Sequence, residues 1–215
     1  MQIAILVYDG FTALDAVGPY EVLGRLPGAE VVFVAEQAGP VRADSGALSL
    51  VAEASLADVP RPDLLLVSGG PGTERLLAPG PVHDWLREAD AHTAWTASVC
   101  SGSLILAAAG LLTGRRATTH WMSTDTLGAL GAVPSAERYV IDGKYATAAG
   151  VSAGIDLALH LAGRLAGDTV AKAIQLVIEY DPQPPYDSGS LDRADRKVVD
   201  VIRSGSQPLL YGDRR

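Results

Sequence analysis

The chain has 215 residues, of which 48% are hydrophobic and 20% charged, and it carries a net charge of −8. The single cysteine excludes an internal disulfide, no apolar run approaches the roughly 20 residues of a membrane-spanning helix, and the acidic balance argues against nucleic-acid binding. The four histidines show no metal-ligand spacing, so we expect a cytoplasmic globular protein without metal or cofactor, whose partners are small molecules rather than membranes or nucleic acid.

The first part of the chain predicts buried strands separated by turns and one helix. Near-continuous apolar runs predict strands covered on both faces at Ile3 to Tyr8, Ala29 to Ala35 and Asp63 to Val67. The segment Phe11 to Asp15 leads into a helix with Pro19 near its first turn, and Val41 to Val51 alternate as in a β-hairpin. The third strand stops in Ser68-Gly-Gly-Pro-Gly72, which lacks the spacing of a phosphate loop. This loop is either a plain turn or a place where bare backbone approaches a ligand.

The second part alternates helices and strands. The predicted elements are a helix over Pro81 to Ala91, a strand over Thr93 to Val99, a helix from Ser101 to Gly110, a short strand over Arg116 to His120, a helix over Met122 to Leu130, a hairpin over Tyr139 to Ala148, and helices over Ser152 to Leu165 and Asp168 to Glu179. This alternation predicts an α/β fold with a doubly wound, mostly parallel sheet and helices on both faces. We expect one domain over residues 1–190, followed by a C-terminal helix or polar tail over 191–215.

Cys100 lies at the predicted corner between a strand and a helix, as in a nucleophile elbow. The turn would push its side chain toward the crevice where α/β proteins bind ligands, and the helix amino terminus would favour the thiolate. A small buried core residue is the alternative, since most free cysteines are of that kind. Gly102 favours the nucleophile, because a glycine two residues after the cysteine lets strand and helix pack closely around a tight turn. We expect a partly exposed thiol with a lowered pKa.

Five stretches resemble the PfpI/ThiJ superfamily, and those in the first and last positions resemble the bacterial isonitrile hydratases in particular. They are Leu14-Asp-Ala-Val-Gly-Pro-Tyr-Glu-Val-Leu23, Gly69-Gly-Pro-Gly72, Ser98-Val-Cys-Ser-Gly-Ser-Leu104, Ala117-Thr-Thr-His-Trp121 and Pro184-Pro-Tyr-Asp-Ser-Gly189. The resemblance implies the flavodoxin-like fold of class I glutamine-amidotransferase domains and a homodimer. It also implies a cysteine-dependent lyase that hydrates an isonitrile to an N-substituted formamide.

The resemblance assigns the nucleophile to Cys100 and its partner carboxyl to Asp15. In that chemistry a thioimidate forms on the cysteine, and the carboxyl serves as general acid and then as base. Ser101 stands where isonitrile hydratases carry threonine, so the hydroxyl is kept and the methyl is lost. The backbone N–H groups of the Gly69-Gly70 loop and of Ser101 are candidates for stabilising charge at the reacting centre.

Two further residues are weaker candidates for the site. Glu21 could approach the sulfur, because superfamily members often place a glutamate near the thiol, but it is more simply a solvated or capping helix residue. His120 could orient the thiol from the end of its strand, although strand-end histidines more often bond to backbone groups.

Two other functions remain open. The same domain resembles the amino-terminal half of AraC-type regulators, which would make this chain a ligand- or redox-sensing module. Those regulators carry a helix-turn-helix domain after this region, whereas this sequence ends at Arg215, and this difference favours the enzyme. The third possibility is a glyoxalase- or deglycase-like cysteine enzyme that acts on small aldehydes.

Overall fold

The computed structural model describes residues 1–204 and divides the chain into two compact units, Met1–Glu179 and Tyr180–Arg215. The expected division at residue 190 stays a prediction, and residues 205–215 of the expected tail lie outside the described residues.

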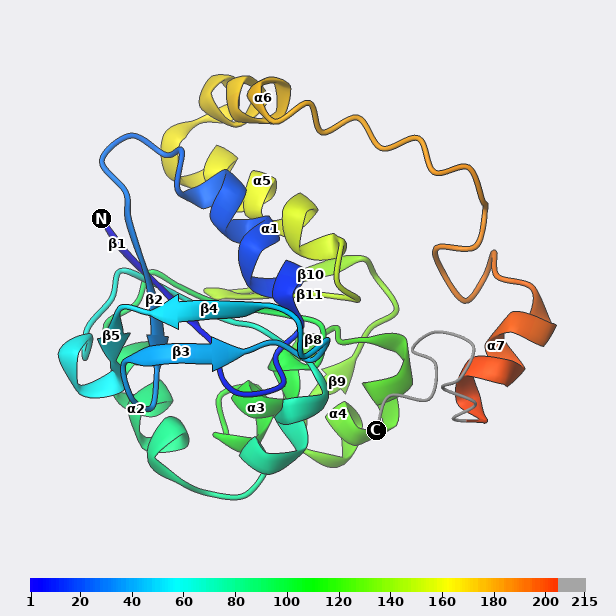
Figure 1. Ribbon diagram of the computed structural model, residues 1–215, viewed down its shortest axis with the longest axis horizontal. Coiled ribbons are helices and arrows are strands. Elements are labelled where there is room, and N and C mark those ends of the chain that lie inside the picture. The colour runs from blue at the N-terminus through cyan, green and yellow to red at the C-terminus, as the bar shows by residue number, and fades with distance from the viewer. Residues whose placement is uncertain (205–215) are drawn as a thin grey trace. The chain divides into compact units, whose positions relative to one another are not determined.

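A single seven-stranded sheet organises the first unit (Figure 1). Its strands run in the order β10 (Tyr139–Asp142), β11 (Tyr145–Ala148), β7 (Trp95–Val99), β6 (Leu64–Val67), β1 (Gln2–Leu6), β2 (Glu30–Ala35) and β5 (Ala54–Ser55). Neighbouring strands pair in parallel except for the antiparallel β10–β11 hairpin. The order reverses between β1 and β6, which is the switch point of a flavodoxin-like sheet and the place where such folds bind ligands. The predicted fold class is confirmed.

Helices cover both faces of this sheet (Figure 1). One face carries α1 (Ala13–Leu23) and α5 (Ala153–Ala166), with α6 (Asp168–Val177) packed on α5, and the other carries α2 (Pro81–Asp90), α3 (Gly102–Ala108) and α4 (Thr124–Ala129). The strands supply both cores in alternation. In β1, Ile3 and Ile5 belong to the core under α1 and α5, whereas Ala4 and Leu6 belong to the opposite core. Continuous apolar strands therefore follow from burial on both sides.

Smaller elements decorate the sheet. The predicted hairpin is present as β3 (Gly39–Arg42) and β4 (Ser49–Ala52), which form a separate antiparallel pair, and the remaining elements are β8 (Arg116–Ala117), β9 (Val133–Pro134), η1 (Leu56–Asp58), η2 (Pro71–Leu76) and η3 (Trp121–Ser123). The strand predicted from Arg116 to His120 is shorter than expected. It pairs with β9 for two residues only, because the N–H of Thr118 turns to the Thr147 hydroxyl at 2.8 Å.

Pro19 lies deeper in α1 than its predicted position near the first turn, so that prediction is wrong. It is the seventh helical residue and is buried. Proline has no N–H group, so the carbonyl of Asp15, four residues earlier, receives no helical hydrogen bond from it. The helix therefore has a weakened ladder at the residue that carries its one acidic side chain near the start.

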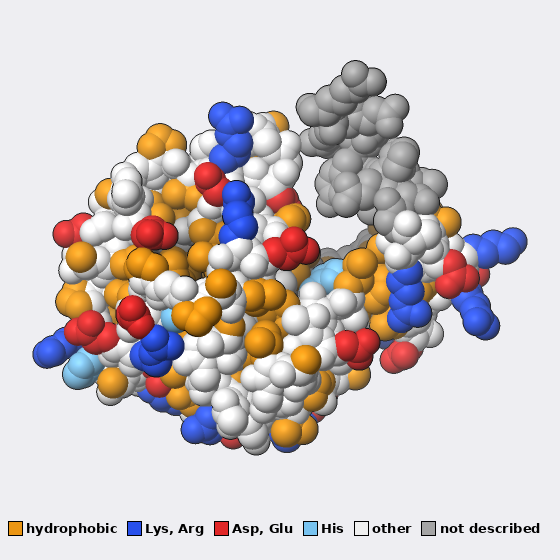
Figure 2. Space-filling model, turned by 90° about the horizontal axis from the view of Figure 1, so that it is seen from below, with side chains coloured by type: hydrophobic (Ala, Val, Ile, Leu, Met, Phe, Trp, Pro, Cys, Tyr) orange, Lys and Arg blue, Asp and Glu red, His pale blue; other side chains and the backbone are white. Residues whose placement is uncertain are grey.

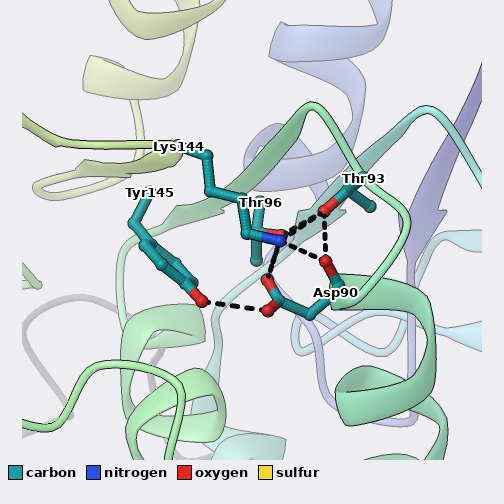
Figure 3. A network of polar contacts seen from close by, with 5 residues as sticks. All are labelled: Asp90, Thr93, Thr96, Lys144 and Tyr145. Atoms are coloured by element: carbon teal, nitrogen blue, oxygen red, sulfur yellow. Dashed lines mark hydrogen bonds and ion pairs between the residues drawn. The ribbon is translucent and has the colours of Figure 1, made fainter.

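A polar network joins α2 to the amino-terminal ends of β7 and β11 (Figure 3). The Asp90 carboxylate accepts hydrogen bonds from the hydroxyls of Thr96 at 2.6 Å and Tyr145 at 2.9 Å, and it forms an ion pair with Lys144 at 3.1 Å. The Thr93 hydroxyl lies 2.8 Å from that of Thr96. Several donors therefore satisfy one buried carboxylate at the end of the strands opposite the Cys100 elbow.

The second unit, as far as residue 204, holds α7 (Arg196–Arg203) and an ion pair between Arg193 and Asp187 at 3.3 Å. None of its described side chains is buried.

Within residues 1–204, no helix is long and apolar enough to cross a membrane. The face shown in Figure 2 carries its basic and acidic side chains scattered among apolar ones.

Candidate active site

Cys100 occupies a sharp turn between β7 and α3. Its φ of 57° lies in the left-handed region that non-glycine residues rarely adopt, and Ser101 caps the helix that begins at Gly102. The Cys100 N–H group donates to the carbonyls of Ala148 and Ala149 at 3.0 and 2.9 Å, which fixes the strained residue to the end of β11. The predicted elbow geometry is confirmed.

Close approach of backbones explains the glycine that follows the elbow. A Cβ atom at Gly102 would lie 2.3 Å from the carbonyl oxygen of Val67 at the end of β6. Any side chain here would push α3 away from the sheet. The predicted reason for this glycine, tight packing of strand and helix, is therefore visible in the distances.

Asp15 is fully buried beside the cysteine. Its Oδ2 accepts a hydrogen bond from the Gly69 N–H at 2.9 Å, and its Oδ1 is buried with no partner at hydrogen-bond distance. A Cβ atom added to Gly69 would lie 2.9 Å from both Asp15 Oδ2 and Cys100 Cβ. The absence of that side chain lets the carboxyl and the cysteine share one small space.

The environment of Asp15 favours its protonated form. Burial raises the pKa of this carboxyl to about 7, against the opposing effects of the Gly69 N–H group and the neighbouring Cys100 thiol, and the charge of Asp44 raises it further. A carboxyl with a pKa near neutral pH can both accept and return a proton under ordinary conditions.

The Cys100 thiol is buried and resists ionisation. Its residue is 6% exposed, and burial raises its pKa to about 12, with the negative charge of Asp15 adding to the rise. The backbone N–H groups of Ser101 and Val151 lower the pKa but do not compensate. Our prediction of a partly exposed thiol with a low pKa is wrong, because desolvation outweighs the short helix that starts at the elbow.

The glycine loop and Ser101 hold each other in place. The Gly70 N–H donates to Ser101 Oγ at 2.9 Å, and Thr73 Oγ1 lies 2.9 Å from the same oxygen. The N–H groups of Gly69 and Gly70, predicted to stabilise charge on a substrate, are both used within the protein. In this arrangement they orient Asp15 and Ser101.

The two weaker candidates have other partners. Glu21 forms an ion pair with Arg25 at 2.6 Å on a half-exposed side of α1. The His120 ring accepts a weak hydrogen bond from the Met122 N–H at 3.4 Å, and burial lowers its pKa. A Cβ atom at Gly150 would lie 3.1 Å from this ring, so His120 stands behind the segment that covers the thiol. The structure brings together Cys100, Asp15, Ser101, Gly69 and Gly70, whereas the partners of Glu21 and His120 are Arg25 and Met122.

Sequence reasoning missed several residues around the thiol. Val151, whose N–H acts on the sulfur, has a φ of 24°, an outlier for a β-branched residue. Thr119 donates to the Cys100 carbonyl at 3.0 Å, and Tyr8 bonds to Thr73 at 2.8 Å. The only signal for Tyr8 and Thr73 was their place next to the ends of β1 and of the glycine loop.

A cavity of about 510 Å³ lies beyond the ends of β1 and β2, lined by Tyr8, Asp9, Glu36 and Arg75 among others. Cys100 and Asp15 do not line it. Over residues 1–204, no group of three or more His, Cys, Asp or Glu side chains is arranged to hold a metal ion.

Comparison with known proteins gives a consistent picture. The model of the DJ-1/PfpI family matches residues 1–164. The chain is 43% identical to an isonitrile hydratase of Pseudomonas putida over 210 residues, which cover 98% of this chain and 92% of the relative. It is similar to the crystal structure of a ThiJ/PfpI family protein from Pseudomonas syringae, with a TM-score of 0.91 and 39% identity over 99% of this chain and 88% of that one. It is also 35% identical to the transcriptional regulator CdhR of Pseudomonas aeruginosa, over 71% of this chain and 47% of the regulator.

Proposed function

The chain belongs to the DJ-1/PfpI family, and we propose that it is an isonitrile hydratase, converting R–N≡C and water to an N-substituted formamide. The observation that carries this proposal is the buried pair of Cys100 and Asp15 at the elbow, seen in a chain that is 43% identical to an isonitrile hydratase over nearly its whole length.

In the first step, the Cys100 sulfur attacks the terminal carbon of the isonitrile. A C–S bond forms and the thiol proton passes through Asp15 to the same carbon, which gives a thioimidate, Cys100–S–CH=N–R. The thiol is a poor nucleophile while protonated, because its pKa is raised to about 12. Its proton has to reach the isonitrile carbon as the C–S bond forms, and Asp15, with a pKa of about 7, can carry it there.

In the second step, water adds to the thioimidate carbon. Asp15 takes a proton from the water and passes it to the nitrogen, giving a tetrahedral intermediate that carries OH and N–H groups. The C–S bond then breaks as the hydroxyl becomes the carbonyl of the formamide, and Asp15 takes the hydroxyl proton and delivers it to the sulfur. Atoms balance without a metal or a redox partner.

The test is product formation from a small panel of substrates. Cyclohexyl isocyanide, methylglyoxal and a dipeptide would each be incubated with the wild-type protein and with Cys100→Ala, and products identified by mass spectrometry. We expect N-cyclohexylformamide from the wild-type protein only. Consumption of methylglyoxal without formamide production would replace this function by the glyoxalase-like alternative.

A further inference from the structure

A chain of hydroxyl groups connects Ser101 to Tyr8. Ser101 Oγ lies 2.9 Å from Thr73 Oγ1, which lies 2.8 Å from the phenol oxygen of Tyr8. Thr73 is 3% exposed and Ser101 is 9% exposed, so little water competes for these bonds. The three residues come from the loop after β1, from η2 and from the elbow. Three distant segments therefore meet at the residue next to the nucleophile.

The direction of every hydrogen bond in this chain follows from its far end. The Tyr8 hydroxyl lies 2.9 Å from the Ser68 carbonyl, which can only accept, so Tyr8 donates its one proton there. Thr73 must then donate to Tyr8, and Ser101 must donate to Thr73. The Gly70 N–H donates to Ser101 Oγ at 2.9 Å, and the other acceptor near Ser101, the Gly70 carbonyl, is farther away at 3.3 Å.

We propose that Tyr8 and Thr73 are positioning residues that fix the Ser101 hydroxyl, so that it offers a lone pair and not a proton to the reacting group. The Ser101 hydroxyl donates its proton to Thr73 and accepts a hydrogen bond from the Gly70 N–H, which leaves one lone pair free on Ser101 Oγ. Burial also raises the pKa of Tyr8 well above its usual range, so the phenol keeps its proton and the directions do not change with pH.

The missing methyl group explains why this chain needs such a device. A threonine side chain is restricted at χ1 by its branched Cβ, whereas a serine hydroxyl rotates among several positions. Ser101 stands where the resemblance to isonitrile hydratases implies threonine. The hydrogen bonds through Thr73 and Tyr8 restrict the rotation of the Ser101 hydroxyl, as a methyl group on Cβ would do sterically.

If the proposed function holds, the free lone pair of Ser101 Oγ gains a hydrogen-bond donor during the reaction. An isonitrile nitrogen carries no hydrogen, but after water adds to the thioimidate it becomes an N–H donor. A fixed acceptor beside Cys100 stabilises that later state and not the substrate itself. Loss of the fixation should therefore lower kcat with little change in KM.

The test is a double-mutant cycle between Tyr8→Phe and Ser101→Ala. We expect Tyr8→Phe to lower kcat for cyclohexyl isocyanide roughly 5- to 30-fold, the range for one lost buried hydrogen bond. In the Ser101→Ala background, Tyr8→Phe should cause no further loss, because the relay has no hydroxyl left to orient. Equal losses in both backgrounds, or no loss in either, would overturn the proposal. Thr73→Val replaces Tyr8→Phe in the cycle if the latter does not fold.

Two further variants separate positioning from general destabilisation. Tyr145→Phe removes another buried phenol hydroxyl, bonded to Asp90 at 2.9 Å at the opposite end of the strands, and should leave kcat unchanged. Ser101→Thr should restore most of the activity of Tyr8→Phe, because the methyl group fixes the hydroxyl independently. A loss in Tyr145→Phe as large as in Tyr8→Phe, or no rescue by Ser101→Thr, would contradict the assignment.

The cycle can also be followed without turnover. The backbone N–H group of Ser101 acts on the Cys100 sulfur. Ser101→Ala keeps this N–H group but loses the hydroxyl that bonds to Gly70 and Thr73, so the N–H group should be held less firmly and the rate at which iodoacetamide alkylates the thiol should change. If the wild-type protein does not hydrate the isocyanide, the proposed function fails, and the alkylation rates of the same four proteins decide the relay. Non-additive changes would support it, and additive changes would overturn it.

Discussion

Replacing Asp15 by asparagine separates the two tasks assigned to this carboxyl. The amide keeps the shape of the carboxyl and can still accept the hydrogen bond from the Gly69 N–H, which is 2.9 Å long in the wild-type protein. It cannot exchange a proton. Loss of general acid–base catalysis is typically worth ~10²–10⁴-fold, and we expect isonitrile hydration to fall by that amount. Glu21 is paired with Arg25 at 2.6 Å, so we do not expect it to take over this role.

The same substitution should have the opposite effect on the thiol. The charge of Asp15 raises the pKa of Cys100, so removing that charge lowers the pKa and increases the thiolate fraction at a given pH. Iodoacetamide should therefore alkylate Cys100 in Asp15→Asn at least as fast as in the wild-type protein, while formamide production collapses. The two rates would be measured between pH 7 and pH 9, by mass spectrometry of Cys100 and by product analysis.

Asp90→Asn is the matched control, because Asp90 is also a buried aspartate but belongs to the network of Figure 3. It should lower stability and leave both rates near the wild-type values. Normal formamide production in Asp15→Asn would remove Asp15 from the mechanism. Parallel slowing of alkylation and hydration would show that the carboxyl only helps to ionise the thiol.

Three other measurements test the structure. The pKa of Asp15 is about 7, so kcat/KM for hydration should rise with pH through about 7 as the carboxylate forms, and a profile that is flat there would contradict a base at this position. Burial lowers the pKa of His83 against the opposing effect of the Leu76 backbone, so native stability should fall as pH drops below the unfolded value of about 6.5; His83→Leu should flatten this dependence in urea unfolding, and an unchanged slope would refute the argument. A Cβ at Gly102 would meet the Val67 carbonyl at 2.3 Å, so Gly102→Ala should cost about 1–3 kcal/mol or more in the same assay, and a neutral result would mean that the elbow is not tightly packed.

The sheet could be predicted because its signal is local. Runs such as Leu64–Val67 are apolar at every position, and only strands covered on both faces require that pattern. Short elements could not be predicted, because they depend on contacts with distant segments. The two residues of β5 pair with β2 just before η1 begins, and nothing in their own sequence indicates a strand. The position of Pro19 was predicted wrongly because the destabilisation that a proline causes inside a helix can be offset by packing, which the local sequence does not reveal.

For the candidate site, the sequence indicated the elbow and its carboxyl but not their electrostatics. The corner at Cys100 follows from strand and helix patterns on either side of it. The pKa of the thiol depends instead on how deeply Asp15 and Val151 enclose it, and both contacts join segments far apart in the chain. The Tyr8–Thr73 bond spans 65 residues, and such pairings appear only when the sheet is assembled.

The residues that cover Cys100 are synthesised well after Cys100 itself. Its N–H bonds to Ala148 and Ala149, and Val151 acts on its sulfur, so the residues that enclose the thiol are translated about 50 positions after it. At ~5–20 residues per second, the ribosome needs several seconds to produce them. Until these residues fold over it, the emerged cysteine has the pKa of a free thiol, near ~8.5, and is more exposed to oxidants than in the folded protein. Newly made chains are thus the population in which this cysteine is most easily damaged.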